Sequence, residues 1–139
     1  MRTQLACAVS AVALFITTSA YAHHSFAAEF DKDKPISITG TISKIDWTNP
    51  HAYLFVDVKG DKPAETTTWK FELGGTRALE SRGWQRSAIK AGDEVTVHGW
   101  RAKDGSNYGN ANDVMLSSGR DLNAASSYNS GSTGTRDGN

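Results

Sequence analysis

Three histidines are the side chains of this sequence best suited to bind a metal ion. His23 and His24 are adjacent, and His51 lies in the stretch Asp46-Trp47-Thr48-Asn49-Pro50-His51. If processing ends at Ala22, His23 carries a free α-amine beside its imidazole, so that one residue offers two nitrogen donors. Sites rich in imidazole nitrogen favour Cu(II) among the divalent ions. The sequence therefore indicates a copper site formed by His23, His24 and His51, provided that the N-terminal arm folds back on the loop that carries His51.

The same histidines have a plainer interpretation. Terminal residues are mobile unless something holds them, so His23 and His24 can be frayed, and His51 can cap or pack at a turn. Phe26 and Phe30 favour a docked arm, because two aromatic side chains so close to the cleavage point gain free energy by burial. We interpret His98 as a surface residue of a strand and not as a ligand.

The first 22 residues have the three parts of a secretory signal peptide. Arg2 supplies the positive charge, residues 5–16 are almost wholly apolar, and Ala20-Tyr21-Ala22 is a small-x-small cleavage site. The apolar run is too short to span a membrane, and no later stretch is long enough. We therefore expect cleavage after Ala22 and a periplasmic or secreted protein without a membrane span.

Composition excludes several classes of protein. Cys7 is the single cysteine and lies inside the signal, so the mature chain has no disulfide and no thiol ligand or nucleophile. Loss of Arg2 with the signal leaves one basic residue fewer than acidic ones. A nucleic-acid-binding protein would show lysine and arginine clustered on one face. We therefore expect no nucleic-acid partner.

The pattern after the signal is that of short strands. Isoleucines at 36, 38 and 42 occupy one face of a strand, and the apolar parity then changes to Ile45 and Trp47, which predicts a β-bulge with Gly40 nearby to permit a bend. Further strands are predicted over residues 53–58, 67–73, 94–100 and 110–116. Residues 76–81 predict a short helix that Thr76 caps and Gly83 ends.

Three strands, a helix and two more strands predict an all-β fold with one short helix, a five-stranded OB-like Greek-key barrel. The alternative is a small open β-sandwich with one helix. In an OB fold, ligands meet the face of strands 2 and 3 and the adjoining loops. The ligand face expected here consists of Trp47, Asn49, Tyr53 and Phe55. Tyr53 and Phe55 could instead cover the far side of the sheet beneath the N-terminal arm, and we prefer that alternative for these two.

The chain divides into four segments. Residues 1–22 are the signal peptide, 23–34 the N-terminal arm, 35–118 the OB-like β-barrel domain and 119–139 a tail. The tail is rich in serine, glycine and asparagine. Such a composition has too little apolar surface to offset the entropy of ordering, so we expect the tail to be disordered.

Four stretches resemble a family of small exported bacterial proteins catalogued as a domain of unknown function. They are His23-His24-Ser25-Phe26-Ala27-Ala28-Glu29-Phe30-Asp31, Gly40-Thr41-Ile42-Ser43-Lys44-Ile45-Asp46-Trp47-Thr48-Asn49-Pro50-His51-Ala52, Arg82-Gly83-Trp84 and Gly92-Asp93-Glu94-Val95-Thr96-Val97. The resemblance covers nearly all of the mature domain. It implies no activity, cofactor or catalytic residue.

Two functions remain open. The first is an exported binding or accessory module, whose partner is a small ligand, a transition metal or a periplasmic protein. The second is a copper-dependent redox enzyme that grips its metal with an N-terminal histidine and His51. An enzyme needs an open coordination position and a shaped substrate site, and the sequence shows neither. We therefore favour the binding module and assign no catalytic residue.

Overall fold

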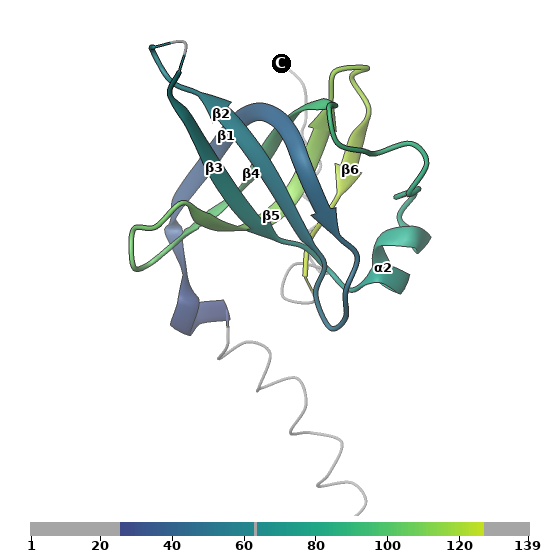
Figure 1. Cartoon of the computed structure of the whole chain (residues 1–139). Coiled ribbons are helices and arrows are strands. Elements are labelled where there is room, and N and C mark those ends of the chain that lie inside the picture. Colours follow the sequence, from purple (N-terminus) through teal and green to yellow (C-terminus); the bar gives the residue numbers. More distant parts are fainter. Residues whose placement is uncertain (1–25, 63, 127–139) are drawn as a thin grey trace, which may run out of the picture.

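The computed structural model describes residues 26–62 and 64–126, and these are mostly β-structure with a short helix (Figure 1). The elements are β1 (Phe30–Asp46), β2 (Tyr53–Lys59), β3 (Thr66–Glu72), α2 (Thr76–Ser81), β4 (Glu94–Ala102), β5 (Tyr108–Leu116) and β6 (Asp121–Asn123). The predicted order of strands and helix is confirmed. Within the described ranges no helix is long and apolar enough to cross a membrane.

β1 is the longest strand and bends so that it can pair on both sides. Its register against β2 shifts between Ile42 and Lys44, which makes Ser43 the extra residue of a bulge. This is where the apolar parity changes, so the predicted bulge is confirmed. A Cβ atom on Gly40 would lie 2.4 Å from the carbonyl oxygen of Asp57. Glycine at this position therefore allows β1 to approach β2 closely where it also pairs with β4.

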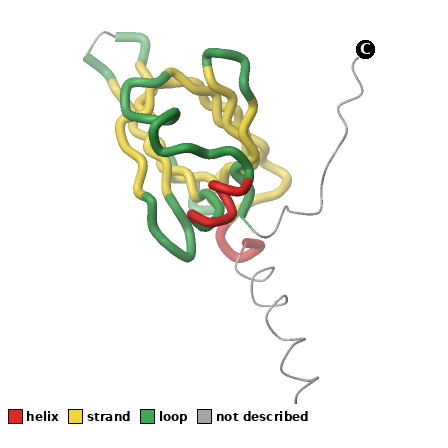
Figure 2. The backbone as a smooth tube through the Cα atoms, turned by 90° about the vertical axis from the view of Figure 1, so that its right-hand side faces the viewer, coloured by secondary structure: helices red, strands yellow, loops and turns green. Residues whose placement is uncertain are grey.

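The strands follow one another in the order β3-β2-β1-β4-β5-β6, and β3 also pairs with β5. The β3–β5 pairing is parallel, whereas the other ladders are antiparallel. The pairings thus lead from β1 through β2, β3, β5 and β4 back to β1. Figure 2 shows the strands surrounding a central space, with α2 close to one end. The side chains that face this space form the core.

The main core is made of residues from all six strands, from α2 and from the connecting segments. Its largest members with almost no exposed surface are Ile42, Leu54, Val56, Phe71, Leu73, Leu79, Trp84, Ile89, Val95, Val97 and Val114. Trp69 is 9% exposed and stacks on Phe71 with a centroid distance of 5.8 Å. Ile38 and Trp47 are half-buried at the edge of this core. The alternation of apolar and polar residues over 67–73 predicts that Trp69 and Leu73 lie inside, and their burial confirms this prediction.

The N-terminal arm is docked on the domain. Phe26 and Phe30 are buried with Ala102 in a second, smaller core. The carbonyl oxygens of Ala27 and Glu29 accept hydrogen bonds from the side chain and the backbone of Lys103. β1 begins at Phe30, inside the segment 23–34 that the sequence assigns to the arm, because Phe30 pairs with Ala102 of β4.

Helix α2 begins differently from the expectation but ends as expected. Its N-cap is Gly75, and no side chain of the helix itself caps it; Asn49 accepts hydrogen bonds from the backbone N–H and the hydroxyl of Thr76, both at 3.1 Å. Gly83 has a φ of +89°, the left-handed conformation that glycine adopts after a helix. The expected capping role of Thr76 is thus corrected, whereas Gly83 ends the helix as predicted.

The described chain stays ordered beyond residue 118. β6 pairs with β5, and the side chains of Leu122, Ala124 and Ala125 are buried. The backbone around Ala124 and Ala125 accepts hydrogen bonds from Gly74 and Arg82, so it is tied to the region of α2. Residues 119–126, which belong to the segment 119–139 that was expected to be disordered, are therefore folded. They are ordered because β6 pairs with β5 and because three apolar side chains are buried. Residues 127–139 lie outside the described part.

Candidate functional site around His51 and Glu72

The loop between β1 and β2 carries His51 and is fixed at several points. The hydroxyl of Thr48 donates to the carbonyl oxygen of His51 at 2.8 Å. The backbone of Ala52 exchanges hydrogen bonds with Leu73 and Gly74, which follow β3. Because both ends of the short loop are held, the position of His51 is set by the end of β3.

The imidazole of His51 has a defined orientation. Its Nδ1 atom lies 3.1 Å from the carbonyl oxygen of Leu73 and 3.6 Å from Oε1 of Glu72. Both oxygens are acceptors, so the hydrogen of a neutral imidazole lies on Nδ1 and the lone pair on Nε2. The side chain is 32% exposed. His51 can therefore present Nε2 as an acceptor or as a metal ligand.

Glu72 is the polar centre of the site. Its carboxylate accepts hydrogen bonds from the hydroxyl of Tyr108 at 3.0 Å and from Nδ2 of Asn110 at 3.2 Å. Asn110 also donates to the hydroxyl of Ser126. The parallel pairing of β3 and β5 sets Glu72 opposite Asn110. The Glu72 side chain is 13% exposed, and these donors supply the partners that a nearly buried carboxylate needs.

We define the Glu72 cluster as Glu29, His51, Tyr53, Lys70, Glu72, Tyr108 and Asn110. Burial, and then the Glu72 carboxylate, raises the pKa of Glu29, while Lys70 and His51 act in the opposite direction. The pKa values of Tyr53 and Tyr108 are raised by the same two causes in the same order. The electrostatic environment of this cluster thus disfavours added negative charge and favours a cation.

Lys70 is the cation that this cluster already contains. Its ammonium nitrogen lies 4.1 Å from the ring centroid of Tyr53 and 5.2 Å from that of Tyr108. Contacts of this kind hold an ammonium group over the electron-rich ring face. Glu29 brings the docked arm into electrostatic range of both Lys70 and His51. Arm, loop and the ends of β3 and β5 therefore meet in one place.

The four residues expected to form a ligand face have different contacts in the structure. Tyr53 and Phe55 lie on the same side of β2, opposite the buried Leu54 and Val56. Trp47 instead packs edge-on against Trp84 at 6.3 Å. Asn49 is engaged with Thr76 at the start of α2. The structure thus brings together two of the four and uses the other two to hold the helix region.

Of the three expected metal ligands, the structure describes only one. His51 lies in the loop described above, whereas His23 and His24 lie outside the described residues. Within residues 26–62 and 64–126, no three histidine, cysteine or carboxylate side chains are arranged to hold a metal ion. The sequence analysis did not identify Glu72, Tyr108 and Asn110 as site residues. Each lies in a strand without a distinctive motif, and only the pairing of β3 with β5 brings them together.

The structure is that of a mostly β domain with one short helix and a polar cluster at the end of β3. The chain belongs to a family of unknown function (DUF6152), whose profile matches residues 11–111. No curated protein matches the sequence. The resemblance to a domain of unknown function is therefore confirmed.

Proposed function

We propose that this protein is an exported accessory module, periplasmic or secreted, that binds copper through His23, His24 and His51. We further propose that its fold is a five-stranded OB-like Greek-key barrel to which β6 is added. The ring of pairings through β1, β2, β3, β5 and β4, with α2 between β3 and β4, supports the barrel. The signal-like residues 1–22 support export.

The orientation of His51 is the observation that carries the copper proposal. Metal-binding histidines commonly donate their second ring N–H to a backbone carbonyl or a carboxylate, which fixes the ring and the tautomer. His51 has both kinds of acceptor beside Nδ1, the carbonyl oxygen of Leu73 and the Glu72 carboxylate. Nε2 is then the nitrogen available to the metal.

The docked position of the N-terminal arm supports the proposal that His23 and His24 are the other ligands. Phe26 is buried, and Glu29 lies within electrostatic range of His51. His24 precedes Phe26 by two residues, so their Cα atoms are separated by at most about 7 Å. The carboxylates of Glu29 and Glu72 add negative charge, which favours a divalent cation beside them. The α-amine of His23 and three imidazoles would provide the nitrogen donors that Cu(II) prefers.

Calorimetric titration of Cu(II) into mature protein that begins at His23 tests this proposal. We expect one equivalent of Cu(II) to bind. One glycine added before His23 converts the α-amine into an amide, and His51→Ala removes one imidazole, so each change weakens binding by more than about tenfold. His98→Gln is the matched control, since it removes a histidine from a strand outside the loop, and it changes the Cu(II) affinity by about twofold or less.

The opposite results are equally clear. Equal Cu(II) affinity of the mature, extended and His51→Ala proteins would exclude the site. Loss of affinity on His98→Gln as large as on His51→Ala would show nonspecific binding to imidazoles.

A further inference from the structure

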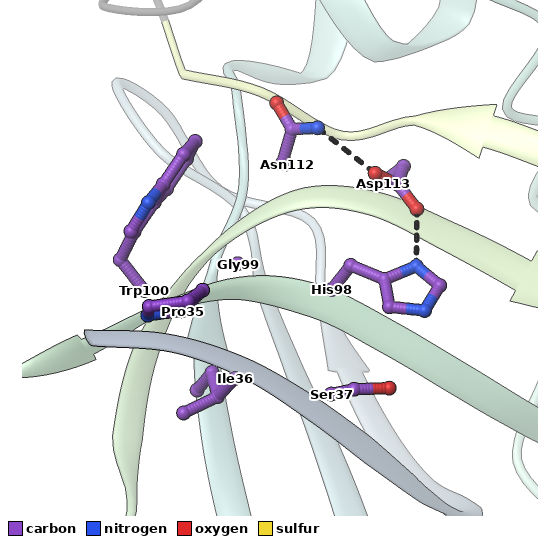
Figure 3. Close-up of a pocket in the computed structure, with 8 residues that line it drawn as sticks. All are labelled: Pro35, Ile36, Ser37, His98, Gly99, Trp100, Asn112 and Asp113. Carbon is purple, nitrogen blue, oxygen red and sulfur yellow. Dashed lines mark hydrogen bonds and ion pairs between the residues drawn. The ribbon is translucent and has the colours of Figure 1, made fainter. Parts of the chain in front are cut away.

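The strands of the sheet differ in how far their edges are covered. β4 pairs with β1 on one side and with β5 on the other, and Nδ1 of His98 in β4 also lies 2.6 Å from Oδ1 of Asp113 in β5 (Figure 3). β6 lies at the end of the sheet, and the indole N–H of Trp84 donates to the carbonyl oxygen of its residue Asn123. The backbone of β4 is therefore paired on both sides, and the outer edge of β6 is partly covered by Trp84.

Two other stretches of strand have one unpaired side, and both carry residues that hinder the addition of a further strand. Within the described residues, β1 pairs with β4 alone before Thr41, and this half contains residues 32–35, which are charged residues followed by a proline. β2 pairs with β1 only as far as Asp57, and Lys59 lies beyond that point. Charged side chains and proline on an edge discourage pairing with another chain. These two edges are therefore protected.

The backbone groups of Thr66 and Thr68 in β3 point away from β2. The N–H of Gly60 donates to the carbonyl oxygen of Glu65, so Glu65 and every second residue after it direct their backbone groups to β2. The residues between them face the other side, as the N–H of Lys70 does when it donates to the loop before β5. β5 pairs with β3 only from Lys70 onward. Thr66 and Thr68 therefore direct N–H and C=O groups to a side on which the described chain provides no strand.

We call Thr66-Thr67-Thr68 the β3 edge. Its residues are exposed and uncharged, and threonine is a residue type enriched in strands. The hydroxyl of Thr68 donates to the carboxylate of Asp57 at 2.6 Å, which holds this part of β3 on β2. The β3 edge is thus an ordered template for a further strand, without the protection that the edges of β1 and β2 have.

We propose that the β3 edge binds the β3 edge of a second copy of this chain, in antiparallel orientation about a two-fold axis at Thr67. The N–H and C=O of Thr66 then pair with the C=O and N–H of Thr68 of the second copy, and the axis repeats this pair. The edge is self-complementary, since each residue that faces outward supplies one donor and one acceptor. The two copies thereby satisfy each other's free backbone groups.

The charges beside the β3 edge fit this register. Trp69 follows Thr67 by two residues, so it lies opposite Glu65 of the second copy, which precedes Thr67 by two residues. The Arg101 guanidinium lies 5.3 Å from the ring centroid of Trp69. The side chain of Glu65 is 57% exposed. An exposed carboxylate of each copy therefore approaches an arginine of the other, and this complementary charge favours a second copy as the partner.

The predicted contact is suited to covalent trapping. Few residues take part, so the buried surface is smaller than in stable dimers and the association is weak and transient. The two Thr67 residues form a non-hydrogen-bonded pair, in which the Cα atoms are about 4.5 Å apart. A disulfide spans Cα atoms that are about 4.4 to 6.8 Å apart. Cysteines at this position are therefore placed to form a disulfide between the copies.

Disulfide trapping of the full chain tests the pairing. In a Cys7→Ser background, Thr67→Cys and Lys59→Cys each introduce the only thiol. Lys59 is the matched control, since it is exposed in the same hairpin but lies on β2. We expect the Thr67→Cys protein to form dimers at least about tenfold faster at equal concentration. The two Lys59 positions of the pair are about three strand spacings apart, roughly 14 Å, which is beyond the reach of a disulfide.

Each rate of dimer formation is divided by the rate at which the same thiol reacts with a small aromatic disulfide, because this removes differences in thiol reactivity. Equal normalised rates for the Thr67→Cys and Lys59→Cys proteins would overturn the proposal.

A change at Thr66 tests the backbone hydrogen bonds themselves. Thr66→Pro removes an N–H that points away from β2, so the β2–β3 ladder keeps its hydrogen bonds, whereas Thr66→Val keeps this N–H. Added to the Thr67→Cys protein, Thr66→Pro should lower the normalised rate to about that of Lys59→Cys, and Thr66→Val should leave it within about twofold. A folded Thr66→Pro protein with an unchanged rate would contradict the pairing. If Thr66→Pro unfolds the hairpin, the comparison of Thr67→Cys with Lys59→Cys still decides the proposal.

Discussion

Glu72 shows how one residue can join three parts of the molecule. Its carboxylate lies at the end of β3, accepts hydrogen bonds from Tyr108 and Asn110 of β5, and approaches His51 of the β1–β2 loop. In the sequence it is only an outward-facing residue of an alternating strand. The local pattern reveals which side it faces, but not the partners, because these arrive through a pairing of distant strands.

Tyr108→Phe tests the cluster at this scale. The change removes the hydroxyl that donates to Glu72, and we expect the free energy of unfolding to fall by about 1.5 to 3 kcal/mol, the range for a hydrogen bond to a charged group. Urea unfolding at pH 8 measures the loss. An unchanged free energy of unfolding would show that the Tyr108–Glu72 hydrogen bond contributes nothing to stability.

Wild-type stability should also depend on pH through Tyr108. Burial, followed by the Glu72 and Glu29 carboxylates, raises the pKa of Tyr108 above the ordinary value of about 10. The folded state therefore holds this proton more tightly than the unfolded state, so its contribution is complete below pH 10 and declines as the pH rises further. Urea unfolding between pH 9 and 11 should show a steeper decline for the wild type than for Tyr108→Phe; parallel curves would contradict the raised pKa.

At the scale of elements, β1 determines how the sheet curves. The parity change in the isoleucine pattern predicts the bulge at Ser43 correctly, since a change of face inside one strand has few other causes. The start of β1 is less predictable. Asp31 to Lys34 carry alternating charges that suggest a solvated arm, yet Phe30 pairs with Ala102 and extends the strand. Such a pairing depends on β4, about 70 residues later, and leaves no local signal.

Gly40→Ala tests the close approach of β1 to β2. The added Cβ would meet the backbone of Asp57 and the side chain of Val56, and a backbone oxygen in a ladder has little room to move. We expect a loss of about 1 to 3 kcal/mol in the free energy of unfolding. Ser43→Ala, an exposed change in the same strand, should alter it by about 0.5 kcal/mol or less. Chemical denaturation of both proteins makes the comparison, and equal stability would show that β1 can shift away from β2.

For the whole molecule, the ring of paired strands explains why a short chain without disulfides can enclose a core. The mostly β class of fold, the order of the first five strands and the helix, and the inward side of residues 67–73 were predictable, because alternation records which side is buried. The tail was not, since Leu122, Ala124 and Ala125 are sparse apolar residues in a polar segment and gain burial only against β5 and the α2 region.

Trp69→Ala tests the closure of the core. Trp69 lies almost fully inside and stacks on Phe71, so truncation should lower the free energy of unfolding by about 3 to 5 kcal/mol. Trp47→Ala is the control at the half-buried edge of the same core and should have a smaller effect. Thermal or urea unfolding provides both values. A larger loss for Trp47 than for Trp69 would show that the interior is centred elsewhere.

The hydrogen bonds from Thr76 to Asn49 make α2 dependent on another part of the chain. A helix of six residues is too short to be stable in isolation. The backbone N–H of Thr76, in its first turn, donates a hydrogen bond to Asn49 of the β1–β2 loop. When that loop opens, the helix loses its anchor, so the two segments unfold locally as one cooperative unit. Slow amide exchange at Thr76 is therefore a remote measure of how firmly His51 is held.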